Sequence, residues 1–227
     1  MPTNGNNKQG SIACEEAFSS FTRRSLTRLR KQPHLLLPGL MGYLRGIYYK
    51  LKFRILFKKI HIGKHFRVYG RLIITGPGRV TFGDDCIISS NVIKTVKIKT
   101  QQPASKIIIG NHVGLNGTSF VCLDQICIDD YAHIADAYIS DSPTKSLSID
   151  RRLYAPSDIP ADRVHIGKNV WISVSVVILQ GVTIGDNSVI AACSLVRKNV
   201  PPNVLVAGIP AKIIQELPES FSPENKS

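Results

Sequence analysis

The sequence is poor in aromatic residues and, over one long stretch, contains no acidic residue. Phe, Trp and Tyr make up 7% of the 227 residues, so most of the 43% hydrophobic content is aliphatic. This composition excludes a disordered chain and suits thin, regular β layers. No Asp or Glu lies between Ala17 and Gly83, a stretch with 15 Lys and Arg. The other 14 basic residues face 16 acidic ones, so the net charge of +13 belongs to the N-terminal third, which we expect to meet an anionic surface.

The sequence also lacks a recognisable metal motif. The five cysteines include no C-x-x-C pair, and the histidines at 112, 133 and 165 are too far apart for a zinc cluster. We therefore predict no metal ion. Four cysteines lie in apolar runs and are predicted to be small buried hydrophobic residues in a reducing compartment: Cys86, Cys122, Cys127 and Cys193.

No apolar run is long enough to span a membrane or to serve as a signal peptide. The most apolar early stretch, His34 to Phe57, is interrupted by Pro38, Gly39, Gly42 and four basic residues. The prediction is a cytoplasmic protein, with peripheral contact at the inner face of the membrane as a further option.

The N-terminal residues divide into two predicted segments. Residues 1–20 are expected to be disordered, and residues 21–60 to form a basic amphipathic helical segment with helices at Phe21–Lys31 and Gly39–Phe57. The second helix has an apolar face with spacings of three and four: Leu40, Leu44, Ile47, Tyr48, Leu51 and Ile55. Two compatible interpretations stay open. The helix lies on an anionic membrane, or it caps the next domain and buries this face there.

From Ile62 onward, aliphatic residues recur at every sixth position. The longest run is Ile166, Ile172, Ile178, Ile184, Ile190 and Val196; shorter runs are Ile109, Leu115 and Val121, then Ile128 and Ile134. Period six excludes an α-helix and simple strand alternation. It predicts short flat strands joined by turns, with the anchors pointing into a narrow prism and three units per coil. We predict an all-β fold, a parallel β-helix over residues 61–215, followed by a flexible tail at 216–227.

The C-terminal motifs resemble those of the hexapeptide-repeat acyltransferases, in particular the sugar and polysaccharide O-acetyltransferases. The motifs are Ile166-Gly-Lys-Asn-Val-Trp-Ile172, Val196-Arg-Lys-Asn-Val-Pro-Pro202 and Gly208-Ile-Pro-Ala-Lys212. The resemblance implies left-handed coiling, a homotrimer, and acetyl-CoA bound as acyl donor between subunits. It also implies transfer to a sugar or glycan acceptor in the biosynthesis of cell-surface polysaccharides or lipid-linked glycans.

The general base is where the chain departs from the family. Members carry a His in an excursion loop of the type D-x-D-x-H-P, and aligning Asp141 places Lys145 at that position. A lysine with an ordinary pKa of about 10.4 is protonated at neutral pH. We predict that His133, one residue before the anchor Ile134 and so pointing outward, takes the proton, while Lys145 and Asp141 orient the acceptor. The alternative is a catalytically degenerate trimer that binds a ligand or acts as a scaffold.

The resemblance also supplies candidates for binding coenzyme A. Its phosphates are expected to meet three basic residues, Arg197, Lys198 and Lys212. Its pantetheine arm is expected to pass small residues, Ser173, Ser175 and Ala192, where the two serines replace glycines of the family and narrow the groove. Nucleic acid is not an expected partner, because the basic N-terminal arm contains no nucleic-acid-binding motif.

Overall fold

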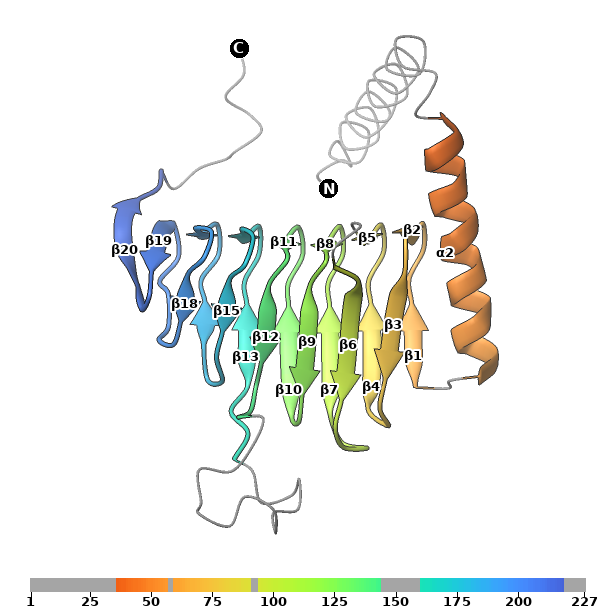
Figure 1. Cartoon of the computed structure of the whole chain (residues 1–227), viewed down its shortest axis with the longest axis horizontal. Helices are drawn as coiled ribbons and strands as arrows, with labels where there is room; N and C mark the ends of the chain where they lie inside the picture. Colours follow the sequence, from red (N-terminus) through yellow and green to blue (C-terminus); the bar gives the residue numbers. More distant parts are fainter. Residues whose placement is uncertain (1–35, 57–58, 91–93, 144–159, 219–227) are drawn as a thin grey trace, which may run out of the picture. The chain divides into compact units, whose positions relative to one another are not determined.

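The computed structural model describes residues 36–56, 59–90, 94–143 and 160–218 (Figure 1). The predicted helix at Phe21–Lys31 and the candidate Lys145 lie outside these residues, as do the whole of 1–20 and most of the predicted tail. Gly42–Ser227 form one compact unit, and the predicted boundary near residue 60 falls inside it.

Three sheets of short strands make up the β-helix (Figure 1). Sheet A contains β1 (Ile60–Ile62), β4 (Arg79–Phe82), β7 (Lys106–Ile109), β10 (Gln125–Ile128), β13 (Val164–Ile166) and β16 (Thr183–Ile184). Sheet B contains β2 (Arg67–Tyr69), β5 (Ile87–Ser89), β8 (Gly114–Asn116), β11 (His133–Ala135), β14 (Trp171–Ile172), β17 (Val189–Ile190), β19 (Val204–Gly208) and β20 (Ala211–Glu216). Sheet C contains β3 (Leu72–Thr75), β6 (Val96–Thr100), β9 (Ser119–Cys122), β12 (Tyr138–Ser140), β15 (Val177–Ile178) and β18 (Leu195–Val196).

The strand order confirms the predicted parallel β-helix. Up to β18, each strand pairs in parallel with the strand three places along the chain, so three strands make one coil. Among the strands in the described ranges, only β19 and β20 pair antiparallel, and this hairpin ends sheet B. Backbone hydrogen bonds between coils satisfy the polar groups of each strand, which lets strands of two or three residues persist.

The residues predicted as anchors fill the prism. All six members of the long run, from Ile166 to Val196, are at most 1% exposed. Val121 was wrongly predicted as an anchor, because its side chain is only partly buried while Phe120 and Cys122 on either side are buried. The step from Leu115 in β8 to the next inward position in β9 takes five residues and not six. Phe120 therefore occupies the position between Ile98 and Ile139 in the ladder of sheet C.

A ladder of asparagines keeps the last coils in register. Asn169, Asn187 and Asn203 all have positive φ, a conformation that Asn tolerates better than most residues. The side chain of Asn169 donates to Oδ1 of Asn187 at 3.0 Å, and Asn187 donates to Oδ1 of Asn203 at 3.1 Å. Each corner is therefore tied to the next by a side chain that also suits the turn.

The cysteines only partly follow the prediction. Cys86 and Cys122 are buried, Cys127 is partly buried, and Cys193 is exposed because it occupies an outward corner with φ 58°. Burial raises the pKa of Cys86 to about 11, and it also raises the pKa of Cys122, to which Asp141 adds. These two thiols therefore remain protonated at neutral pH and act as small apolar side chains.

Helix α2 (Leu36–Leu56) corresponds to the helix predicted at Gly39–Phe57, and it caps the first coil. A Cβ on Gly46 would lie 1.8 Å from the carbonyl oxygen of Phe66, so only glycine permits this approach. The Tyr49 hydroxyl accepts a hydrogen bond from the backbone N–H of Leu72 at 3.2 Å, and Phe53 is buried in the core. The packed face therefore comprises Gly42, Gly46, Tyr49 and Phe53.

The apolar face identified from the sequence is a different one, and it remains exposed. Leu44, Ile47, Tyr48, Leu51 and Ile55 are 41–75% exposed. The expectation that capping would bury these residues was wrong, because two glycines on another face let the helix backbone approach the coil. The structure thus confirms the capping helix and leaves an apolar stripe uncovered among the described residues.

Candidate functional site

His133 lies in a groove on the outer face of sheet B. Its strand, β11, runs between β8 and β14, and His133 pairs with Gly114 on one side and Trp171 on the other. The groove has a volume of about 240 Å³ and is lined by these three residues together with Ile87, Ser89, Leu115, Asn116, Ile134 and Ala135. A Cβ on Gly114 would lie 2.6 Å from Nδ1 of His133, so the glycine makes room for the imidazole. His133 and Trp171 are both exposed and point outward, as expected.

A second groove follows at the corner between sheets B and C. It measures about 260 Å³, and Lys94, Asp136, Tyr138 and Ser175 are among its lining residues. Lys94 Nζ lies 2.5 Å from Oδ1 of Asp136, and the backbone N–H of Ser175 donates to the carbonyl of Asp136 at 3.1 Å. Ala135, the last residue of β11, lines the first groove and the next residue, Asp136, lines the second, so the two grooves adjoin where β11 ends.

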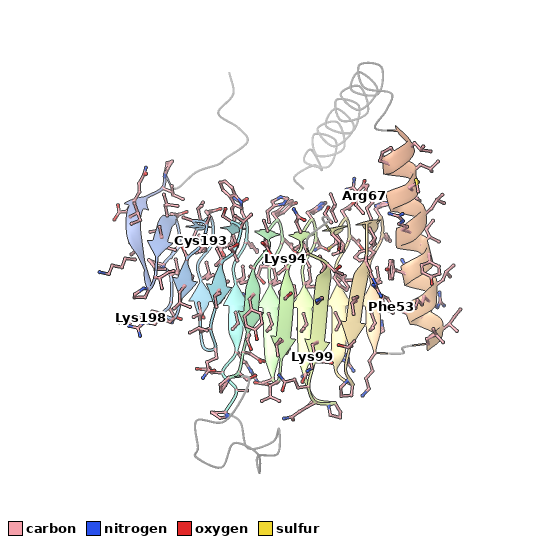
Figure 2. All side chains as sticks on the ribbon, in the orientation of Figure 1. Phe53, Arg67, Lys94, Lys99, Cys193 and Lys198 are labelled. Atoms are coloured by element: carbon pink, nitrogen blue, oxygen red, sulfur yellow. The ribbon has the colours of Figure 1, made fainter. Side chains whose placement is uncertain are left out.

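The six residues predicted to bind coenzyme A fall into two groups, which lie at opposite ends of the strands of sheet C. Ser173, Ser175 and Ala192 share the corner between sheets B and C, and Lys212 pairs with Ala207 at the same end of β19. Arg197 and Lys198 are exposed beyond the other end of β18. Figure 2 shows this separation, with Cys193 labelled at one edge of the sheet and Lys198 at the other. The five-residue step between them spans at most about 18 Å, so an extended ligand can reach both groups.

Asp141 is fully buried just after β12, where the long connection to β13 begins. Its Oδ1 accepts the backbone N–H of Leu123 at 2.7 Å, and its Oδ2 accepts that of Asp124 at 2.7 Å. Its carbonyl accepts the backbone N–H of Asp162 on the returning chain at 2.8 Å. This geometry gives Asp141 a structural role at the base of the excursion and removes its carboxylate from direct contact with an acceptor on the surface.

The fold brings together one polar cluster that the sequence analysis did not predict. His165 Nε2 lies 2.9 Å from Oδ2 of Asp129, and Cys127 Sγ lies 3.9 Å from Oδ1 of the same carboxylate. All three side chains lie on the outer face of sheet A. They were missed because the pairing of Cys127 with His165 joins strands on either side of the excursion, whose length hides the period. Nearby, Asp124 accepts a hydrogen bond from Arg163 at 2.8 Å and raises the pKa of that guanidinium further.

Comparisons with known sequences agree with the repeats. Residues 163–198 match the family described as bacterial transferase hexapeptide (six repeats). The galactoside O-acetyltransferase of Escherichia coli is 34% identical over 121 residues, which is 51% of this chain and 60% of the relative. A putative acetyltransferase of Saccharomyces cerevisiae is 39% identical over 112 residues, 49% of this chain and 53% of the relative. The chain thus spans little more than half the length of these relatives.

Solved structures show the same fold. A hexapeptide-repeat acetyltransferase of Vibrio cholerae in complex with acetyl coenzyme A superposes with a TM-score of 0.52 at 28% identity, covering 86% of this chain and 90% of the other. A galactoside acetyltransferase in complex with coenzyme A gives a TM-score of 0.50 at 23% identity, with coverages of 78% and 82%. The left-handed coiling implied by the sequence motifs is thereby confirmed.

Proposed function

We propose that this chain, whose residues 163–198 match the bacterial transferase hexapeptide family, transfers an acetyl group from acetyl-CoA to a hydroxyl of a sugar or glycan acceptor. The observation that carries the proposal is the outward imidazole of His133, in a groove that adjoins the corner with Ser175. The sugar acceptor is supported by similarity to a galactoside O-acetyltransferase. The finer assignments follow the same proposal: a homotrimer in the cytoplasm that serves the synthesis of surface polysaccharide or lipid-linked glycan.

In this mechanism the imidazole of His133 accepts the proton of the acceptor hydroxyl while the hydroxyl oxygen forms a bond to the carbonyl carbon of the acetyl group. Acetyl-CoA supplies the activated acetyl group, and the proton leaves with the coenzyme A thiol when the thioester bond breaks. A positioned base contributes roughly 10²–10⁴-fold to such steps. Backbone N–H groups stabilise the charge that develops on the carbonyl oxygen. Lys145, outside the described residues, would hold the acceptor, and Asp141 would fix the base of its loop.

The chain offers a fitting surface for coenzyme A. Ser175 and Ala192 are small and exposed along one edge of sheet C, and Arg197 and Lys198 are exposed along the other. Small side chains leave room for the pantetheine arm beside the backbone, and basic side chains pair with phosphates by charge-assisted hydrogen bonds. This combination favours an enzyme that uses coenzyme A as donor over the alternative, a catalytically degenerate trimer that acts as a scaffold.

Replacing both Arg197 and Lys198 with Ala is expected to weaken coenzyme A binding by about 1.5–3 kcal/mol, the range for hydrogen bonds to charged groups. Isothermal titration calorimetry measures the effect. Lys168→Ala is the matched control, because Lys168 is an exposed lysine at a corner between sheets A and B and should bind as wild type. Absence of coenzyme A binding by the wild-type protein would end the proposal of acetyl transfer.

The degenerate-trimer alternative makes a different prediction for turnover. An active enzyme releases coenzyme A thiol from acetyl-CoA faster when a sugar acceptor is added, whereas a scaffold binds the donor without acceptor-dependent release. Screening nucleotide sugars and extracted polysaccharide separates the two, and light scattering after size exclusion tests the trimer.

Helix α2 supports a further proposal, that the protein makes contact with an anionic membrane. None of the helices in the described ranges has the length and hydropathy to span a bilayer. The exposed stripe of α2 is apolar, and Arg45, Lys50 and Arg54 are exposed on the same helix. An apolar stripe flanked by cations is the pattern of helices that lie in the headgroup region of anionic membranes. This location would bring the enzyme to lipid-linked acceptors.

The change Leu51→Gln is expected to reduce partitioning to vesicles containing phosphatidylglycerol about tenfold, because burying a leucine side chain contributes roughly 1.5–3 kcal/mol. The matched control is Ile213→Gln on β20, since Ile213 is 54% and Leu51 53% exposed. Vesicle co-sedimentation gives the measurement, and high salt should weaken wild-type binding. Equal binding of both variants would contradict the membrane role. Loss of a higher oligomer in Leu51→Gln would instead assign the stripe to a second copy.

A further inference from the structure

Three side chains able to bind a metal meet on the outer face of sheet A. They are Cys127 in β10, Asp129 just after β10, and His165 in β13. One ligand atom from each lies within 4.8 Å of the other two. Neither groove described above includes these residues, so the cluster is separate from the proposed site of acetyl transfer.

The backbone holds the three residues in place. Cys127 pairs with His165 in the parallel ladder of β10 and β13. The N–H of Asp129 donates to the carbonyl of Ile166 at 2.8 Å, and the N–H of His165 donates to that of Val182 at 3.0 Å. Cys127 and His165 lie on strands, which keep ligand spacing better than loops because neighbouring strands fix the backbone, and the hydrogen bond to Ile166 holds Asp129 in the turn after β10.

The spacing fits a small tetrahedral cation. Zinc–ligand bonds of 2.0–2.3 Å place neighbouring ligand atoms about 3.3–3.8 Å apart. His165 Nε2 lies 2.9 Å from Oδ2 of Asp129, and Cys127 Sγ lies 3.9 Å from the other oxygen, Oδ1. One ligand atom from each residue lies within 4.8 Å of the other two, so side-chain rotations of about 1 Å would bring the three to tetrahedral spacing. Sulfur, imidazole nitrogen and carboxylate oxygen together are ligands typical of Zn²⁺ and not of Mg²⁺ or Ca²⁺.

We propose that Cys127, Asp129 and His165 bind one Zn²⁺ ion per protomer, with the fourth position open on the outer face of sheet A. The Cys127 thiol gives its proton to solvent as the sulfur–zinc bond forms. The ion joins β10 to β13, the two strands of sheet A on either side of the excursion. It therefore clamps the coil from which the excursion departs.

The alternative interpretation, in which Asp129 and His165 form a catalytic acid–base pair, explains less of this geometry than a zinc site does. His165 meets the carboxylate through Nε2, the nitrogen farther from its backbone, which leaves Nδ1 next to the main chain and poorly placed to reach a substrate. Such a pair also gives no role to Cys127. A metal ion uses all three groups.

The test is titration of the full chain, first stripped with EDTA, with Co²⁺ as a spectroscopic probe. One Co²⁺ per protomer and a thiolate-to-cobalt charge-transfer band are expected, and Zn²⁺ should abolish the band. Cys127→Ser should remove the band, and both Cys127→Ser and Asp129→Asn should weaken Zn²⁺ binding more than the roughly 10–100-fold caused by changes to outer-shell groups. Cys193→Ser, at a distant exposed corner, is the matched control and should keep the band.

Two results would overturn the zinc site: a wild-type protein that gives no charge-transfer band, or a band that survives in Cys127→Ser. Coenzyme A binding is measured on the same EDTA-treated protein. Because the two sites are separate, it should be unchanged, so failure of the zinc proposal and failure of the acetyltransferase proposal give different results.

Discussion

Replacing His133 with Ala is expected to lower the rate of acetyl transfer by about 10²–10⁴-fold, the contribution of a positioned general base. The imidazole is exposed and donates to no described residue in the core, so its removal should change the free energy of unfolding by no more than about 0.5 kcal/mol. Coenzyme A affinity should be retained, because the phosphate-binding candidates Arg197 and Lys198 lie just after β18 in sheet C and do not line the groove of His133. Steady-state kinetics and urea unfolding of the same preparation test both parts.

The matched control is His61→Ala, which removes an exposed strand histidine from sheet A. It should retain wild-type activity. Full activity in His133→Ala, with a rate that keeps rising above pH 9, would assign the base to Lys145 instead. A wild-type protein without turnover that gains it in Lys145→His would mean that the enzyme has degenerated.

The repeat could be predicted from the sequence because the anchors of its longest run obey one geometric rule. Ile166 to Val196 are spaced by six since each strand and turn together take six residues, and their burial needs no information from elsewhere in the chain. The outward direction of His133 followed from its place beside the anchor Ile134 by the same rule.

The predictions from sequence failed where contacts or corner lengths that the repeat does not report determine which side chains are buried or meet. The exposed stripe of α2 is more apolar than the packed face, and only the approach of Gly46 to Phe66 determines which face is buried. Phe120, and not Val121, occupies the inward position in β9, because the step from Leu115 takes five residues instead of six. The cluster around His165 depends on strand pairing across the excursion, a contact that no local period reports.

Replacing Asp141 with Ala is expected to lower the free energy of unfolding by about 1–4 kcal/mol. The carboxylate is fully buried and accepts the backbone N–H groups of Leu123 and Asp124, both at 2.7 Å. Truncation leaves the buried N–H of Leu123 without an acceptor, at about 1–3 kcal/mol, and the partly buried N–H of Asp124 adds a smaller cost. Asp141→Asn should cost less, because its amide oxygen can still accept one of the two N–H groups. Urea unfolding measures both variants.

A second acidic residue at the same base separates this role from general electrostatics. Asp124 binds Arg163 at 2.8 Å, but their side chains are 44% and 66% exposed, so Asp124→Ala should cost at most about 1 kcal/mol. Equal small losses in Asp124→Ala and Asp141→Ala would contradict the anchoring role and mean that the freed N–H groups find other acceptors. The backbone hydrogen bond from Asp162 to the carbonyl of Asp141 is kept in Asp141→Ala, so this variant tests the carboxylate alone. Its main expected effect is on stability, whereas His133→Ala should reduce activity alone.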